Sequence, residues 1–270
     1  FVRRRFGQEA LDRIVQPMVG GIYTADPEHL SMRATLPRFV EMEQKHGSLL
    51  RAVWHEQRSA AEDRFTDDQP SGISGARYGL FASLKGGMSE LLDALESRVR
   101  QSGTIELGTS IAEVRQTPSQ QYELQTANGD NRTFEAIVIA LPAFRASALV
   151  ASWDGRLAQR LTYIPYASSA IVVTGHRLQD IQYPMDAFGL VIPQVEQRNI
   201  LAVSFLSRRF AGRSPEGTIQ VRTFVGGAMQ PEILEQDHDA LVRVVLAELR
   251  DIFGIEGQPL FQRVARCERA

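Results

Sequence analysis

The sequence holds a single cysteine, Cys267, in 270 residues. One thiol forms neither an intrachain disulfide nor a cysteine-based metal cage, and such scarcity is typical of a reducing compartment. Long apolar runs are absent too, since residues 136–142 and 170–174 are among the longest and have only strand length. No secretory signal opens the chain. We therefore expect a protein that is cytoplasmic or peripheral to the inner face of a membrane.

Basic and acidic side chains are nearly equal in number. The chain carries 30 basic and 32 acidic side chains, a formal net charge of −2, and the two signs are interspersed. This balance argues against a nucleic-acid scaffold or a strongly basic membrane-binding patch. The length suits one large or two modest domains with a substantial apolar core.

Motifs for several kinds of catalysis are missing. There is no G-x-S-x-G nucleophile elbow and no suggestion of a Cys–His pair, which disfavours a hydrolase. The five histidines share no spacing typical of metal ligands, so we expect no metal site. The acidic pair Asp67-Asp68 lies in a polar loop and is best interpreted as solvated charge. No G-x-G-x-x-G occurs, and the glycine pairs at 20–21, 86–87 and 226–227 indicate turns or close backbone approaches.

The first third of the chain has helical periodicity. An apolar stripe recurs at Leu11, Ile14, Val15, Met18 and Ile22, and Pro17 inside it predicts a kink or an early stop. This stripe is either core, which we favour, or a face that contacts a membrane. We also expect a helix to start at 26–28 and another helix at 37–46 that Gly47 ends. A further helix is predicted at 49–62, capped by Ser48, and a loop at 64–75.

Strands dominate the rest. We expect strands at 78–84, 105–107, 111–115 and 122–126, a turn at 128–130, and a buried strand at 135–141 that Pro142 ends before a short helix. Met88, Leu91, Leu92, Leu95 and Val99 mark one face of a helix. Further strands are predicted at 168–176, 188–192, 200–206, 218–226 and 260–267, with an amphipathic helix at 238–253. The predicted fold class is α+β with a mixed or antiparallel sheet.

A series of short sequence segments resembles segments of the protoporphyrinogen oxidase family, which belongs to the flavin-containing amine oxidase superfamily. The segments occur in the same order as in that family. They are FVRRRFG (1–7), GGIYTAD (20–26), LSMRATLP (30–37), HGSL (46–49), SLKGGM (83–88), IALP (139–142), YASSA (166–170), FGLVIP (188–193), FAGRSPEG (210–217) and GG (226–227). The resemblance implies three parts. These are a helical, membrane-associated type of subdomain at 1–80, the middle of an FAD-binding α/β domain at 81–151, and a substrate-binding sheet domain at 152–270.

The resemblance also implies a chemistry. Enzymes of this family use FAD to oxidise protoporphyrinogen IX to protoporphyrin IX, with dioxygen accepting the electrons, in haem biosynthesis. The cofactor carries the redox step, and the protein mainly positions a flat, carboxylated macrocycle. An absence of acid–base residues is then expected. The resemblance further allows a homodimer and peripheral membrane contact.

The matched segments also imply which residues bind the substrate and the cofactor. For the substrate, Gly21 resembles a position whose backbone approaches the tetrapyrrole, and Val191 and Phe224 resemble apolar residues on either side of the pocket. For FAD, Ile111 resembles a strand residue whose main chain pairs with the adenine. Ala140, Leu141 and Pro142 resemble the end of a strand beside the nucleotide, where α/β sheets place such ligands. No catalytic residue is assigned.

The chain also departs from the family pattern. The G-x-G-x-x-G unit and its acidic ribose-binding residue would precede Phe1, as would an arginine that anchors a substrate propionate in some members of the family. A glycine-rich block would follow Ala270, and Cys267 stands where an aromatic residue is expected. We therefore expect an internal fragment that alone neither binds FAD tightly nor turns over. Stoichiometric flavin in the purified chain would contradict this.

Three alternatives remain open. Coproporphyrinogen III, with four carboxylates, would demand more basic pocket residues than protoporphyrinogen IX, and the sequence does not place them. An amine oxidase or carotenoid desaturase would share the flavin domain, but the matched helical segments within residues 1–52 disfavour both. A flavin-free module that binds tetrapyrroles or docks on membranes is the alternative outside enzymes.

Overall fold

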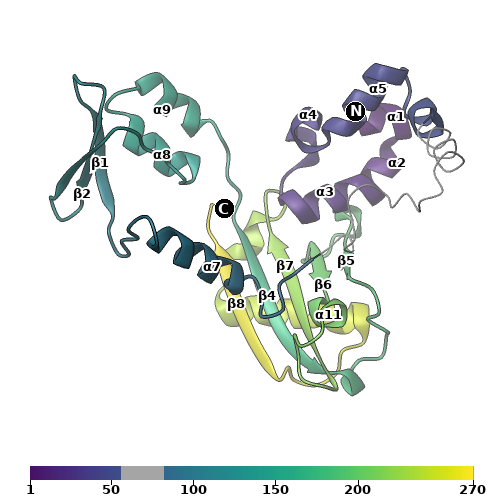
Figure 1. Cartoon of the computed structure of the whole chain (residues 1–270). Helices are drawn as coiled ribbons and strands as arrows, with labels where there is room; N and C mark the ends of the chain where they lie inside the picture. The colour runs from purple at the N-terminus through teal and green to yellow at the C-terminus, as the bar shows by residue number, and fades with distance from the viewer. Residues whose placement is uncertain (56–81, 270) are drawn as a thin grey trace, which may run out of the picture. The chain divides into compact units, whose positions relative to one another are not determined.

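The computed structural model of the chain describes residues 1–55 and 82–269 (Figure 1). The described chain divides into two compact units, one made of residues 1–55, 82 and 167–269 and the other of residues 83–166. The first unit therefore joins the helical start of the chain to the large sheet, although the second unit separates them in sequence. Helices and antiparallel sheets make up both units, as the α+β prediction requires.

The helical start of the chain consists of short helices. They are α1 (Val2–Phe6), α2 (Gln8–Ala10), a π-helical turn (Leu11–Val15), α3 (Gln16–Tyr23), a 3-10 turn (Pro27–His29), α4 (Met32–Thr35), α5 (Pro37–His46) and helical residues 49–55. Pro17 does not stop the helix. It lies in the first turn of α3, where a missing amide donor costs little, and the chain changes from π-helix to α-helix there.

Two of the predicted caps, at Asp26 and Gly47, are confirmed. The Asp26 side chain accepts a hydrogen bond from the Glu28 amide at 2.8 Å, and Pro27 follows it in the first turn. Helix α5 has the predicted bounds and ends at Gly47, whose φ of 69° is left-handed. The predicted apolar stripe is not a single core face, because Ile14 and Met18 are 59% and 54% exposed.

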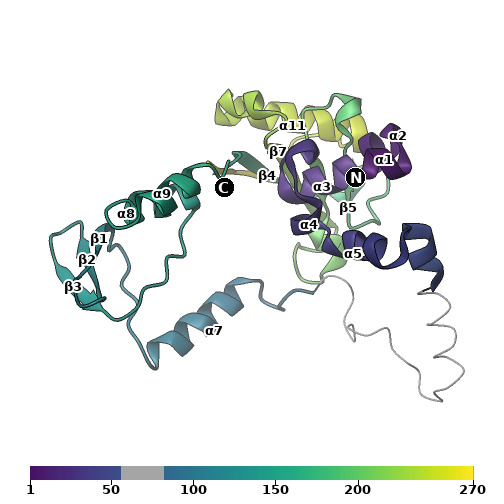
Figure 2. The same ribbon diagram turned by 90° about the horizontal axis from the view of Figure 1, so that it is seen from above.

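A five-stranded antiparallel sheet forms the body of the first unit. Its order is β5-β6-β7-β4-β8, from β4 (Ser169–Arg177), β5 (Gly189–Val191), β6 (Ala202–Ser204), β7 (Thr218–Gly226) and β8 (Phe261–Cys267). Helix α11 (His238–Phe253) covers one face, as Figure 2 shows. Short connections complete the unit: α10 (Leu206–Arg209) and 3-10 turns at Leu178–Asp180, Gln194–Glu196 and Pro231–Glu235.

The core lies between the sheet and α11. Alternate residues of β7, namely Ile219, Val221, Thr223 and Val225, are buried, as period-2 strands with one covered face require. From α11, the side chains Leu241, Val242, Val245 and Leu249 complete this core. The intervening residues of β7 lie on the opposite, open face of the sheet, which α11 leaves uncovered.

The second unit contains α7 (Ser89–Arg100), an antiparallel sheet β1-β2-β3 and two further helices. The strands are β1 (Ile111–Gln116), β2 (Tyr122–Thr126) and β3 (Asn131–Phe134), and the helices are α8 (Ala143–Val150) and α9 (Gly155–Thr162). The predicted turns at 86–87 and 128–129 are confirmed. Pro142 directly precedes α8, as expected.

Two predicted strands of this unit are wrong. Residues 105–107 are irregular and pair with no described strand. Residues 135–141 form no ladder, and Val138 is 94% exposed instead of buried on both faces. A strand needs hydrogen-bonded neighbours, and the described part of the chain supplies none there. Residues 82–84 are irregular, while 78–81, 56–62 and the predicted loop at 64–75 lie outside the described residues.

Candidate functional site

Helix α3 packs across the end of the sheet at which β7 finishes. The Gln16 side-chain oxygen accepts a hydrogen bond from the Gln194 amide at 3.0 Å, and the Thr24 carbonyl accepts one from the Ala228 amide at 2.9 Å. These bonds tie both ends of α3 to loops that leave the sheet. The predicted substrate residue Gly21 is thereby held against the sheet.

The open face carries an apolar row that crosses four strands. Val191 pairs with Ala202, Ala202 pairs with Phe224, and Phe224 pairs with Ile171. Directly opposed residues of antiparallel strands point to the same face, so these four side chains form a continuous row. The predicted substrate residues Val191 and Phe224 both belong to it. Val191 is 40% exposed.

Gly21 touches the first two members of this row. A Cβ atom at Gly21 would lie 3.3 Å from Val191 Cγ1 and 3.8 Å from the Ala202 Cβ. The missing side chain therefore lets α3 lie directly on the sheet, which gives the glycine a packing role. The structure thus brings Gly21 and Val191 into contact, and both to the row of Phe224. Their contact with a tetrapyrrole stays a prediction.

Two arginines stand beside the apolar row. Arg222 pairs with Val173, and Val173 pairs with Arg263, so the three share the open face. The Arg222 guanidinium carbon lies 5.4 Å from the centre of the Phe224 ring. No ion pair joins either guanidinium to a carboxylate of the residues that the structure describes. Sequence reasoning missed both, although the spacing of two between Arg222 and Phe224 places them on one face.

The residues predicted to bind FAD all lie in the second unit. Ile111 begins β1 and pairs with Thr126, and the register shifts between Ile111 and Glu113. Arg115 donates two hydrogen bonds of 2.7 Å to the Glu113 carboxylate, and those bonds lower the pKa of Glu113. Arg115 is thus already paired within β1.

Ala140, Leu141 and Pro142 form an exposed, irregular stretch just before α8, with a bend at Leu141. Leu141 is 50% exposed, and the Tyr166 hydroxyl accepts a hydrogen bond from the Ala143 amide at 2.7 Å. Within the described chain, the amides of 136–141 have no backbone hydrogen-bond partner. Unpaired backbone groups beside an apolar side chain fit the edge of a flavin nucleotide, so these residues are compatible with the predicted role.

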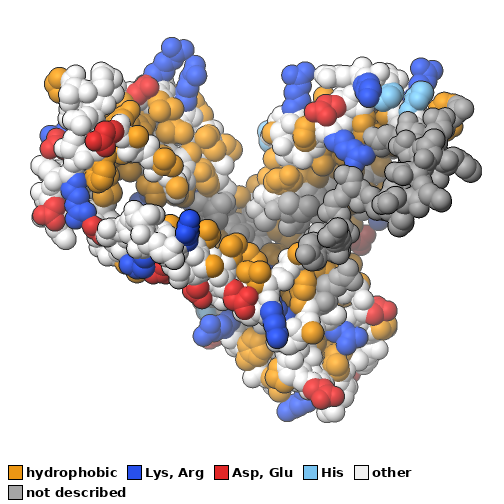
Figure 3. Space-filling view, viewed as in Figure 1, with side chains coloured by type: hydrophobic (Ala, Val, Ile, Leu, Met, Phe, Trp, Pro, Cys, Tyr) orange, Lys and Arg blue, Asp and Glu red, His pale blue; other side chains and the backbone are white. Residues whose placement is uncertain are grey.

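Apolar side chains are exposed widely on the second unit. Figure 3 shows them gathered over this part of the chain. On α7 the face predicted from the sequence exists but is uncovered by described residues, with Met88, Leu92 and Leu95 between 53% and 67% exposed. Exposed apolar area of this extent typically marks a surface that another structure covers.

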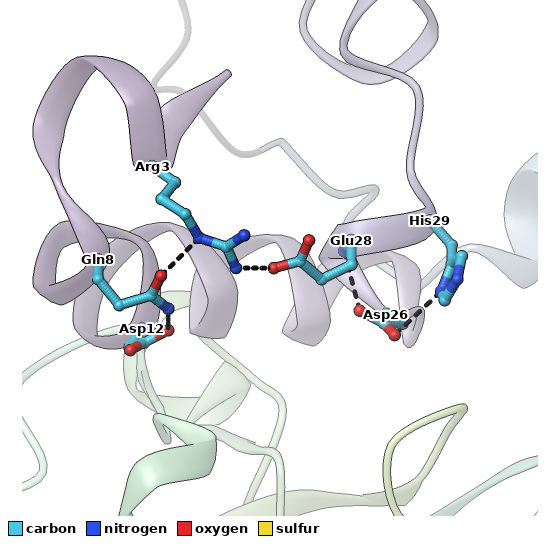
Figure 4. A network of polar contacts seen from close by, with 6 residues as sticks. All are labelled: Arg3, Gln8, Asp12, Asp26, Glu28 and His29. Carbon is cyan, nitrogen blue, oxygen red and sulfur yellow. Dashed lines mark hydrogen bonds and ion pairs between the residues drawn. The ribbon is translucent and has the colours of Figure 1, made fainter.

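The helical start of the chain holds a network of polar contacts rather than a catalytic cluster. Arg3 donates hydrogen bonds to the side chains of Gln8 and Glu28, and Gln8 donates one to Asp12 at 2.7 Å (Figure 4). Asp26 binds His29 at 3.0 Å. These side chains are largely solvent-exposed, so each pair contributes little stability. The network borders a cavity of about 180 Å³ lined by apolar residues that include Leu11, Val15 and Val19.

No cluster of histidine, cysteine, aspartate or glutamate with the arrangement of a metal site occurs among the described residues. The described helices include none long and apolar enough to cross a membrane. No nucleophile–base pair was predicted from the sequence. In the described chain the arrangement suits positioning of a flat apolar molecule, because its most continuous feature is the row from Val191 to Ile171.

Comparison with known proteins agrees with this geometry. The family model described as flavin-containing amine oxidoreductase matches residues 1–266. The chain is 27% identical over 274 residues to a coproporphyrinogen III oxidase of Staphylococcus aureus, covering 100% of this chain and 56% of that protein. It is 29% identical over 283 residues to the Arabidopsis thaliana protoporphyrinogen oxidase 2, chloroplastic/mitochondrial, covering 96% of this chain and 54% of that protein.

Solved structures show the same fold. A protein of Exiguobacterium sp. 255-15, named provisionally as a protoporphyrinogen oxidase, superimposes with a TM-score of 0.76 at 23% identity, over 99% of this chain and 53% of that one. A reduced UDP-galactopyranose mutase superimposes with a TM-score of 0.54 at 12% identity, over 68% of this chain and 40% of that one. The chain spans about half the length of the curated relatives it matches. With the family model matched over nearly its whole length, the chain belongs to the flavin-containing amine oxidoreductases, a family whose cofactor is a flavin.

Proposed function

We propose that this chain is part of an FAD-dependent oxidase that converts protoporphyrinogen IX to protoporphyrin IX with dioxygen as acceptor. The observation that carries the proposal is the open face of the five-stranded sheet, with the apolar row Val191, Ala202, Phe224 and Ile171. A flat apolar row suits a flat macrocycle, and the names of the relatives support this substrate class. Coproporphyrinogen III is the alternative substrate.

The chain's own residues would bind and orient the substrate. Phe224 offers a ring face for stacking, and Val191 and Ile171 extend the contact along the row. When bound, the flavin would accept the hydride, which explains why the described residues need no acid–base pair. In this assignment the second unit contributes to the flavin-binding domain, with Ile111 and residues 140–142 beside the nucleotide.

The test is an assay of the full-length protein that contains this chain, with each porphyrinogen and added FAD. Porphyrinogens do not fluoresce in the visible range and porphyrins do, so product formation is followed directly. Oxidation of protoporphyrinogen IX in preference to coproporphyrinogen III supports the proposal, and the reverse preference would select the alternative substrate. Flavin content is measured on the same preparation. Porphyrin binding by the full-length protein without flavin or turnover would instead favour a flavin-free tetrapyrrole-binding module.

The role of Gly21 has its own test. Alanine is favoured over glycine inside a helix by about 1 kcal/mol, and the added methyl would press on Val191 Cγ1, a side chain that is 40% exposed. We expect Gly21→Ala to change the free energy of unfolding by less than about 1 kcal/mol. If the macrocycle borders Val191, the displaced side chain should weaken porphyrin binding roughly tenfold.

The matched control is Gly20→Ala. A Cβ atom at Gly20 would meet only the Gln16 side chain, at 3.1 Å, and no residue of the apolar row. Binding is measured by fluorescence quenching of protoporphyrin, and stability by urea unfolding. Equal binding by wild type and Gly21→Ala, with both variants stably folded, would remove Gly21 from the site.

Peripheral membrane contact is a second candidate, favoured by the exposure of Ile14 and Met18. Both stand on the helical start of the chain, where Phe6 and Trp54 are also more than half exposed. An apolar face of this kind can insert at a lipid interface. We expect the chain to float with liposomes and the double variant Ile14→Ser/Met18→Ser to stay in the soluble fraction. Absence of wild-type flotation would refute the membrane contact.

A further inference from the structure

The open face of the sheet carries its positive charge in one row. Arg222 on β7 and Arg263 on β8 flank Val173 on β4, in the register Arg222↔Val173↔Arg263. Adjacent strands lie about 4.8 Å apart, so the two Cα atoms stand about 10 Å apart on the same face. This row is next to the apolar row, because Arg222 lies two residues before Phe224 on the same strand.

Neither Arg222 nor Arg263 forms an ion pair that would stabilise the fold. Other arginines of this unit are used structurally. Arg198 binds Glu248 at 2.9 Å and Asp251 at 2.6 Å, and Arg266 donates to the carbonyls of Leu234 and Gln236. Arg222 and Arg263 make no such ion pair with described residues, and the Arg222 guanidinium stacks on the Phe224 ring. Val173 between them is apolar and gives neither one a partner.

A guanidinium without a partner at the border of an apolar surface is a ready site for a carboxylate. It offers a planar fork of donors that matches a carboxylate's two oxygens. Its stacking on Phe224 also limits the conformations of Arg222, so less entropy is lost on binding. Two such groups about 10 Å apart can each reach one of two carboxylates carried by neighbouring short chains of one ligand.

We propose that Arg222 and Arg263 bind two carboxylates on one edge of the substrate, while the macrocycle lies over the half-buried members of the apolar row, Phe224 and Ile171. The inference rests on the proposed function, whose substrate it places on this face. The substrate class it names is a flat macrocycle with two carboxylate chains on adjacent rings and apolar groups on the opposite side. A macrocycle with four carboxylate chains would place its second pair toward the Val191 end of the row, where the strands offer no cation from the described residues.

The test compares porphyrins that differ in charge but not in ring shape. Protoporphyrin, its dimethyl ester and coproporphyrin are titrated against the full chain by fluorescence quenching. The protein is wild type or the double variant Arg222→Gln/Arg263→Gln. Each lost charged hydrogen bond should weaken protoporphyrin binding about tenfold, so the double variant should bind it roughly 100-fold more weakly. The double variant should bind the dimethyl ester with an affinity within about twofold of the affinity of the wild-type chain for the same ester.

The matched control is Arg243→Gln/Arg250→Gln. Both of its arginines are exposed on α11, which packs against the other face of the sheet, and the pair removes the same net charge. We expect this control to bind protoporphyrin as wild type does, and wild type to bind protoporphyrin more tightly than coproporphyrin. Far-UV circular dichroism verifies that each variant is folded.

The outcomes separate the two proposals. If wild type binds protoporphyrin and the Arg222/Arg263 variant binds it equally well, the carboxylate site is overturned while the proposed function stands. Equal weakening by the α11 control would also overturn it, since the effect would then be one of net charge. If wild type binds neither the acid nor the ester, the proposed function itself fails.

Discussion

Replacing Glu248 by alanine is expected to lower the free energy of unfolding by about 3 kcal/mol. Glu248 is buried at the α11 side of the first unit, where its carboxylate accepts three hydrogen bonds of 2.9 Å. The donors are the Arg198 guanidinium, the Asn199 amide and the Asn199 side chain. Alanine would leave the two Asn199 donors without this acceptor and would leave Asp251 as the remaining carboxylate on Arg198. Urea unfolding at pH 7 measures the loss.

The pH dependence provides a second readout. Burial by itself would raise the pKa of Glu248, but the hydrogen bonds from Asn199 and Arg198 outweigh it, so the pKa lies below its ordinary value of 4.5. A carboxyl whose pKa is lowered on folding stabilises the protein above its unfolded pKa and loses that effect as the pH falls through the folded pKa. The difference between wild type and Glu248→Gln should therefore shrink below about pH 4.5.

The control for Glu248 is Asp251→Asn. Asp251 binds the same guanidinium at 2.6 Å but its side chain is 64% exposed, so its loss should cost no more than about 0.5 kcal/mol. Equal losses from Asp251→Asn and Glu248→Ala would show that burial of the carboxylate does not decide its contribution.

The sequence predicted best the elements whose signals are local. Helix α5 has its predicted bounds because Pro37 begins it and Gly47 ends it, and both effects depend on one residue's backbone. Helix α11 and strand β7 also have their predicted bounds. In α11 and β7, the spacing of apolar residues predicted a buried face, and other parts of the chain cover that face.

Predictions failed where the partner of an element decided its structure. Residues 135–141 have the composition of a buried strand, yet they form no ladder in the described chain, since a strand's hydrogen bonds are made with its neighbours. The stripe with Ile14 and Met18 has the period of a helix with one buried face. Periodicity specifies a face, but it does not say what covers that face.

The candidate site was predicted in part. The resemblance selected Gly21, Val191 and Phe224, and the structure brings them to one apolar row. Arg222 and Arg263 were missed because they are far apart in the sequence, and only the register of β7, β4 and β8 aligns them. Register depends on pairing across strands, which a single sequence does not reveal.

The contact between the helical start of the chain and the sheet should depend on Gly227. Its φ of 79° is left-handed, and a Cβ atom there would lie 2.9 Å from the Thr24 carbonyl oxygen. That oxygen also accepts the Ala228 amide at 2.9 Å, so moving it would break the bond that holds the end of α3. We expect Gly227→Ala to cost about 3 kcal/mol, from left-handed strain and the displaced contact together.

Gly212→Ala separates the two causes. Gly212 has a similar φ of 75°, and a Cβ atom there would meet nothing within 4 Å. This variant should cost only the backbone strain, about 1 kcal/mol. Urea unfolding measures both variants, and amide hydrogen exchange of α3 should accelerate in Gly227→Ala alone, because only that residue approaches Thr24. Equal stability losses with unchanged exchange in α3 would show that Gly227 does not control how the helices dock on the sheet.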